Sequence, residues 1–251
     1  MSHLDRWWLH PPTNLTIAND KVHVWRASLD LAAVHIRELE CTLASDERER
    51  AERFRFHKDR VRFIVAHGLL RAILGRYVGV EPSQLRFCYS SHGKPALAWE
   101  FEGGVIRFNL SHSHKLALYA VTCGREVGID LEYIRADLAG EQIVRQFFSP
   151  REVADLQALP ADMQTAAFFN CWTRKEAYIK ARGEGLSLPL DQFAVSLAPG
   201  EPAVLLSTAG DSSEAARWSL QALYPGTGYV AALAVEGHSW RLESWQWLGH
   251  L

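Results

Sequence analysis

Cysteine is scarce in this chain of 251 residues, and its four copies, at positions 41, 88, 123 and 171, contain no C-x-x-C pair. Their wide spacing argues against a zinc cluster and against a disulfide framework, so we expect free thiols in a reducing compartment. The sequence also lacks an apolar run near the roughly 20 residues that a spanning helix needs. Its first residues, MSHLDRWWLHPP, lack the basic and apolar regions of a signal peptide. We therefore expect a cytoplasmic protein that does not bind a membrane.

A strong excess of charge of either sign is also missing. The formal net charge is -2, from 27 basic and 29 acidic residues. Such a balance argues against nucleic acid as a partner, because binding to its phosphates normally needs a basic surface. Hydrophobic residues make up 48% of the chain and charged residues 22%, which is ordinary for a globular protein able to bury a sizeable core.

Apolar periodicity predicts a mixed α+β fold. Strand and helix patterns occur in blocks rather than in strict alternation, which favours α+β over a doubly wound parallel sheet. No sequence repeat is visible between the two halves. Strands are expected at 22–29, 85–90, 105–110, 116–122 and 126–134, followed by a C-terminal meander within 192–248. Helices are expected at 31–39, from 45 onward, and at 58–77, 140–148, 150–158 and 164–182.

Two acidic residues stand on the same face of one predicted strand. In Gly128-Ile129-Asp130-Leu131-Glu132, the alternation of a strand points Asp130 and Glu132 one way and the apolar residues the other way, into a core. Adjacent carboxylates repel each other unless a cation lies between them. A solvated strand face is the alternative that these residues alone leave open.

A third acid lies in the most strongly helical segment, around Trp172-Thr173-Arg174-Lys175-Glu176. Spacing places Glu176 on the apolar face of this helix, where a carboxylate is costly unless it is paired or binds a cation. A surface salt bridge with Lys180 is the alternative. If Glu176 meets the two strand acids, the all-oxygen site suits Mg²⁺.

Groups that could bind phosphate lie on the N-terminal side of these three acids. The segment 48–62 carries more basic than acidic residues, and although most of them form an ordinary solvated helix face, arginine binds phosphate with a planar pair of donors. Lys94 lies in a predicted turn, and Ser111 and His112 lie in a loop predicted at 111–115 that joins two strands as a hairpin. These side chains offer an ammonium, a hydroxyl and ring nitrogens to an anion. His112 and His114 also form an H-x-H pair, which alone is a weak metal signal.

Five segments together closely resemble the Sfp-type (surfactin-synthetase-activating) 4'-phosphopantetheinyl transferase family. They are GKPAL (93–97), FNLSHS (108–113), VGIDLEYI (127–134), FFSPREV (147–153) and WTRKEAYIKARGEGLSLPL (172–190). The resemblance spans roughly residues 45–193. It implies two similar α+β halves related by a pseudo-twofold axis, with the active site in the cleft between them. We divide these halves at 1–123, which would contribute to coenzyme A binding, and 124–251, which would carry the metal site and the dock for the carrier protein.

The resemblance also implies the reaction and the roles of residues. The phosphopantetheinyl arm of coenzyme A would pass to a serine of an apo acyl or peptidyl carrier protein, with Mg²⁺ (or Mn²⁺) required and 3',5'-ADP released. Asp130, Glu132 and Glu176 correspond to the metal-binding acids, and Glu176 and Lys180 to catalytic residues. The positions that contact coenzyme A correspond to Lys94, Ser111, His112 and Lys180, with Arg48, Arg50 and Arg62 as candidates in the basic segment.

A carrier dock is expected around Ile134–Phe148, where arginines flank apolar residues, because carrier proteins are generally acidic. Members of this type are usually monomers, and fatty-acid, polyketide and nonribosomal-peptide carriers are all possible substrates. Two rival functions remain open: a metal-dependent phosphodiesterase, which also uses clustered carboxylates, and a catalytically inactive module that binds carrier proteins.

Overall fold

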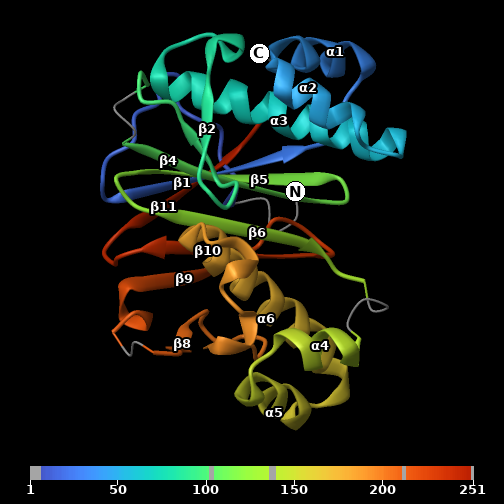
Figure 1. The fold of residues 1–251 in the computed structure, drawn as a ribbon, viewed down its shortest axis with the longest axis vertical. Helices are drawn as coiled ribbons and strands as arrows, with labels where there is room; N and C mark the ends of the chain where they lie inside the picture. The colour runs from blue at the N-terminus through green and yellow to red at the C-terminus, as the bar shows by residue number, and fades with distance from the viewer. Residues whose placement is uncertain (1–6, 102–104, 136–139, 211–212, 250–251) are drawn as a thin grey trace.

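The computed structural model describes residues 7–101, 105–135, 140–210 and 213–249 and confirms the mixed α+β fold in two halves (Figure 1). The first half contains β1 (Lys21–Ser28), α1 (Ala33–Thr42), α2 (Ser45–Glu52), α3 (His57–Val78), β2 (Phe87–Tyr89), β3 (Pro95–Leu97), β4 (Ile106–Ser113) and β5 (Leu116–Cys123). The second contains β6 (Val127–Tyr133), α4 (Glu141–Phe147), α5 (Pro150–Ala158), α6 (Ala161–Arg182), β7 (Phe193–Val195), β8 (Leu205–Thr208), β9 (Trp218–Leu223) and β10 (Tyr229–Glu236). The last strand is β11 (Arg241–Gln246), and single 3₁₀ turns lie at Pro82–Gln84, Gly185–Ser187, Leu190–Gln192 and Ala215–Arg217.

Two sheets pack face to face between two long helices. The strand order is β11-β1-β5-β4 in one sheet and β6-β10-β9 in the other. Side chains such as Val24, Leu118 and Ile129 form a core between the sheets, while α3 and α6 cover the two outer faces (Figure 1). This layering leaves the outward face of β6 in contact with α6, which brings the acidic strand against the acidic helix.

The two halves repeat the same order of elements, a strand, three helices, a short hairpin and two strands. A shared pair of buried ions marks the repeat. Glu47 is the third residue of α2 and binds Arg71 of α3 at 2.6 Å, and Glu152 is the third residue of α5 and binds Lys175 of α6 at 2.7 Å. Arg71 and Lys175 each lie fourteen residues beyond the first residue of a 22-residue helix. The repeat is not visible in the sequence, because the two halves share the order of elements and the position of the buried ion pair but not the identities of their residues.

Three sequence predictions about the elements are wrong in detail. The loop expected at 111–115 is mostly strand, since β4 continues to Ser113 and pairs with β5 in register, with Ser111 opposite Leu118. The C-terminal strands do not form one meander, because β11 crosses to the first half and pairs in parallel with β1. Strand β8 was not predicted, and the domain division at residues 123 and 124 stays a prediction.

No described helix combines the length and the apolar character that crossing a bilayer requires.

A buried histidine in the first half predicts a pH dependence of stability. His23 is 1% exposed on β1, its Nδ1 lies 2.8 Å from the Tyr77 hydroxyl, and its Nε2 lies 3.1 Å from Glu243 Oε2. Burial lowers the pKa of His23 to about 4, despite the nearby Glu243 carboxylate. The unfolded chain takes up a proton near the ordinary value of about 6.5, whereas the folded protein takes it up only near pH 4. The free energy of unfolding should therefore fall by about 2 kcal/mol between pH 7 and pH 5.

Urea unfolding of the wild type and of His23→Gln at the two pH values measures this contribution. We expect the variant to lose most of that pH dependence, while His57→Gln, which removes an exposed histidine, keeps it. Equal pH dependence in the wild type and in His23→Gln would contradict the assignment.

Candidate active site

Side chains, rather than a backbone ladder, join the edge strands of the two sheets at the predicted site. Alternate polar residues of β4 accept hydrogen bonds from alternate backbone N–H groups of β6. The bonds run from Ile129 N to Asn109 Oδ1 (2.9 Å), from Leu131 N to Ser111 Oγ (3.2 Å) and from Tyr133 N to Ser113 Oγ (3.1 Å). Because these bonds fix β4 against β6, they also fix where the acids of β6 lie relative to the first half.

Asp130 lies at the centre of this arrangement. Its side chain is almost completely buried, and its Oδ1 accepts hydrogen bonds from Ser111 Oγ at 3.0 Å and from Lys180 Nζ at 2.6 Å. Lys180 Nζ also lies 3.1 Å from Ser111 Oγ. The other oxygen, Asp130 Oδ2, is buried with no hydrogen-bond partner among the described residues. An unpartnered buried carboxylate oxygen is costly, so a further ligand is required there.

The structure brings Glu132 and Glu176 to the same place. Glu132 Oε2 accepts a hydrogen bond from Ser113 Oγ at 3.0 Å, and burial and the Asp130 carboxylate raise the pKa of Glu132. Burial, together with the carboxylates of Asp130 and Glu132, raises the pKa of Glu176 to about 7 against the opposing effect of Lys180. The alternative considered for Glu176, a surface salt bridge with Lys180, does not form, because Lys180 pairs with Asp130 instead.

The donor set fits a hard cation. The Asp130 carboxylate raises the pKa values of Glu132 and Glu176, and the buried Asp130 Oδ2 has no partner among the described residues, as expected around Mg²⁺. Across the described ranges, no three histidine, cysteine or acidic side chains are grouped closely enough to hold an ion as they stand. The same finding leaves the H-x-H pair of His112 and His114 without a third ligand.

A cavity of about 280 Å³ opens beside the acids. Its walls include Lys94, Asn109, Glu176 and Lys180. Its size and its mixture of charged and apolar walls suit part of an extended anionic ligand.

Lys94 lines this cavity, but its ammonium is already bonded to groups of the protein. Its Nζ donates hydrogen bonds to Glu126 Oε2 at 2.6 Å and to the Ala181 carbonyl oxygen at 2.7 Å. Burial lowers the pKa of Lys94, although Glu126 counteracts this effect. The lysine predicted to bind an anion therefore also holds the carboxyl end of α6.

Basic side chains gather on the first-half side of the site. His112 is partly exposed, but burial of its ring, followed by electrostatic interactions with His67, Lys180 and Arg62, lowers the pKa of His112 to about 4. Its ring is therefore neutral at pH 7. His67 stacks on Phe63, with ring centroids 4.0 Å apart.

The three predicted arginines differ in their surroundings. The Arg50 guanidinium lies 5.4 Å from the centroid of the Phe63 ring, and Arg62 pairs with Asp59 at 3.6 Å. The structure thus links Arg50 and Arg62 to the group around His67 and His112. Arg48 instead donates a hydrogen bond to the Cys41 carbonyl oxygen.

Sequence reasoning missed four residues of the site: Asn109, Ser113, Glu126 and His67. For the first two a signal exists only once β4 is known to extend to Ser113, because Asn109, Ser111 and Ser113 then alternate along one strand and share one face. Glu126 and His67 carried no such signal, since their partners lie far away in sequence.

The predicted carrier dock is only partly described, because residues 136–139 lie outside the described ranges. Within the rest, Phe148 is buried and stacks on Phe168, and Phe147 is half-buried against Trp172. Phe148 thus belongs to the core, as is more often the case for an aromatic residue in such a segment, and the dock itself stays a prediction. Arg145 is exposed and pairs with Glu141 at 3.0 Å.

Comparison with known proteins identifies the class. Residues 126–234 match the 4'-phosphopantetheinyl transferase superfamily, and residues 30–124 match the 4'-phosphopantetheinyl transferase N-terminal family. The chain belongs to the 4'-phosphopantetheinyl transferase superfamily. It is an enzyme of the two-domain Sfp type, which transfers the 4'-phosphopantetheinyl group from coenzyme A to carrier proteins.

Individual relatives agree with this class. The chain is 45% identical over 244 residues to the 4'-phosphopantetheinyl transferase HetI of Nostoc sp. (strain PCC 7120), covering 97% of this chain and 100% of the relative. It is 34% identical over 155 residues to Sfp of Bacillus subtilis (strain 168), covering 62% of this chain and 66% of the relative. A solved ACPS–CoA complex from Chronobacterium ammoniagenes aligns with a TM-score of 0.34 at 20% identity, covering 45% of this chain and 98% of that one, a likeness too low to carry an argument.

Proposed function

We propose that this transferase attaches the phosphopantetheinyl arm to a serine of an apo acyl or peptidyl carrier protein in a magnesium-dependent reaction that releases 3',5'-ADP. The observation that supports it most is the electrostatic coupling of Glu176 to Asp130 and Glu132, with Lys180 bonded to Asp130, beside a cavity. Acidic residues next to an anion site are unfavourable unless a cation joins them, and a pyrophosphate with Mg²⁺ meets that requirement.

Asp130, Glu132 and Glu176 would hold the magnesium ion. When bound, Mg²⁺ would neutralise charge on the pyrophosphate. Asp130 Oδ2, buried and without a partner in the described chain, is the best available ligand atom. Lys180, fixed by Asp130 and Ser111, would direct its ammonium to a pyrophosphate oxygen.

The chain's own residues would prepare the attack. The carrier serine oxygen forms a bond to the β-phosphorus, the bond from that phosphorus to the oxygen of 3',5'-ADP breaks, and the serine proton must leave. Glu176, which lines the cavity, is the proposed acceptor. Without the metal, burial and neighbouring acids raise the pKa of its carboxyl to about 7, close to the value that suits a general base at neutral pH, and Glu176 would take the proton when it does not hold the ion. Positioning and electrostatics then supply most of the catalysis.

Recognition of coenzyme A would extend across the first half. Lys94 lines the cavity, Ser111 donates a hydrogen bond to Asp130, and Arg62 adds positive charge near the His112 ring, where the 3'-phosphate would bind. Arg50 lies over the ring of Phe63, which stacks on His67. Arg48 stays a weaker candidate, since its described contact is with Cys41. We further propose that the protein acts as a monomer, because one chain supplies both sides of the site.

Intact-protein mass spectrometry tests the reaction. An apo acyl carrier protein and an apo peptidyl carrier domain are each incubated with the protein, coenzyme A and Mg²⁺, with a chelator control. We expect a gain of one phosphopantetheinyl arm that the chelator prevents. No gain on either carrier, with coenzyme A still bound, would favour an inactive carrier-binding module. Hydrolysis of a phosphodiester without a carrier would favour the phosphodiesterase alternative.

The proposed carrier dock around Arg145 can be tested separately. Arg145 is 78% exposed on α4, so Arg145→Glu should weaken binding of an acidic carrier through charge repulsion, raising KM for the carrier by about tenfold. Steady-state kinetics against each substrate measures this, and Arg151→Glu on α5, another exposed arginine, is the matched control. The KM for coenzyme A should not change. Equal losses for both substrates would contradict the dock.

A further inference from the structure

The repeat between the halves gives the catalytic helix a counterpart in α3. Counting from the equivalent ion-paired residues, Lys180 lies five positions beyond Lys175, as Arg76 lies five beyond Arg71. Both helices then end at a glycine with positive φ, Gly79 after α3 and Gly183 after α6. Arg76 therefore occupies the position in the first half that Lys180 occupies in the second.

The acids of the active site have no counterpart there. Ala72 stands four residues before Arg76, as Glu176 stands four before Lys180. Trp25 lies on the face of β1 that packs against α3, as Asp130 lies on the face of β6 turned toward α6. The first half thus keeps the cation and replaces the carboxylates with apolar side chains.

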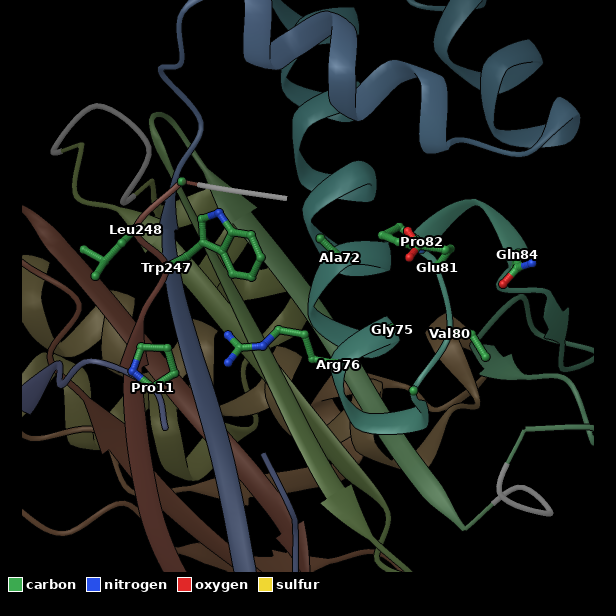
Figure 2. Close-up of a pocket in the computed structure, with 12 residues that line it drawn as sticks. Pro11, Ala72, Gly75, Arg76, Val80, Glu81, Pro82, Gln84, Trp247 and Leu248 are labelled. Atoms are coloured by element: carbon green, nitrogen blue, oxygen red, sulfur yellow. The ribbon is translucent and has the colours of Figure 1, made fainter. Parts of the chain in front are cut away.

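A cavity of about 650 Å³ lies at this position (Figure 2). Its walls include Pro11, Ala72, Val80, Trp247 and Leu248 together with Arg76. Figure 2 shows the Arg76 side chain directed toward Pro11 and Trp247. This size lies in the range of small-molecule sites, and a mostly apolar lining with a few charged or polar groups is typical of them.

Arg76 has unused capacity for binding an anion. The side chain is half-buried, its Nη2 donates one hydrogen bond to the Pro12 carbonyl oxygen at 2.9 Å, and its guanidinium lies 5.2 Å from the centroid of the Trp25 ring. Of its five N–H donors, the other four have no protein acceptor within the described ranges, and no described carboxylate lies within 4.0 Å. A half-buried guanidinium without a counter-ion favours a negatively charged ligand.

We propose that this cavity binds a small organic molecule with a single carboxylate on an apolar body, the carboxylate at Arg76 and the body against Trp247 and Leu248. The planar guanidinium suits a carboxylate, and the half-buried Trp247 indole in the cavity wall suits an aromatic or acyl body. Glu81 also lines the cavity, on the opposite side of α3 in Figure 2. Its negative charge disfavours a multiply charged ligand such as coenzyme A, so the site would be distinct from the catalytic one.

Calorimetric titration with 2-naphthoate tests the proposal, using protein saturated with coenzyme A and Mg²⁺ to keep the catalytic cavity occupied. We expect one site per chain, and at least about tenfold weaker binding in Arg76→Gln, because a hydrogen bond to a charged group is lost. Arg86→Gln removes a more exposed arginine that pairs with Glu100, and it should bind as the wild type does. The neutral analogue 2-naphthamide should bind at least about tenfold more weakly than the acid.

A second variant guards against a general loss of structure in Arg76→Gln. Leu248→Glu keeps the arginine and places a carboxylate on an exposed side chain of the cavity wall, where it would repel the carboxylate of the ligand, so 2-naphthoate binding should again fall. Phosphopantetheinyl transfer should continue in both variants, since neither residue contacts the catalytic acids. Absence of 2-naphthoate binding, equal binding of the neutral analogue, or unchanged binding in Arg76→Gln would overturn the proposal.

Discussion

Replacing Asp130 by asparagine should lower the rate of phosphopantetheinyl transfer on the order of a thousandfold or more while leaving the protein folded. Asparagine has the shape of aspartate and keeps an oxygen that can accept the bonds from Ser111 and Lys180. It removes the negative charge and the buried Oδ2 that lacks a partner. The loss should therefore fall on metal binding and catalysis rather than on packing.

Single-turnover mass spectrometry of an apo carrier protein measures the rate, and thermal unfolding without Mg²⁺ measures stability. Asp155→Asn on α5 is the matched control, because Asp155 is exposed and pairs only with Arg151 at 3.7 Å among the described residues. It should transfer at the wild-type rate. A rate for Asp130→Asn within tenfold of the wild type would show that Asp130 is not a metal ligand.

Replacing Gly128 by alanine should damage both stability and activity. A Cβ at position 128 would lie 2.1 Å from the Ala177 carbonyl oxygen and 2.3 Å from the Ala181 nitrogen, both backbone atoms of α6. Neither atom can move without shifting the helix, so we expect a loss of about 3 kcal/mol or more in the free energy of unfolding. A displaced α6 would also carry Glu176 and Lys180 away from the acids of β6, lowering the transfer rate at temperatures where the variant stays folded.

Urea unfolding and the carrier assay at low temperature test the two parts separately. Gly140→Ala is the control, because a Cβ there would meet no atom within 4 Å and its φ of -86° suits any residue. Gly140→Ala should lower the free energy of unfolding by less than about 1 kcal/mol. Stability of Gly128→Ala close to the wild type would show that α6 does not depend on this close approach.

Several parts of the site could be read from local patterns. Alternation along β6 placed Asp130 and Glu132 on one face, and helical spacing placed Glu176 on the buried side of α6. Both predictions follow from strand and helix geometry, which sequence periodicity reports directly. The length of β4 could not be read in this way, because the polar residues Ser111 and Ser113 resemble a loop until their partners on β6 are known.

The sequence by itself determined the helices, most strands and the family to which the enzyme belongs, because short motifs and periodicity are local properties of the chain. Only the tertiary structure decided that Lys180 pairs with Asp130, that Lys94 is bound to Glu126, and that β11 returns to β1. It also revealed the repeat marked by the pair of Glu47 and Arg71 and the pair of Glu152 and Lys175. These contacts join residues far apart in the chain, and their energies depend on burial and distance, which no single segment encodes.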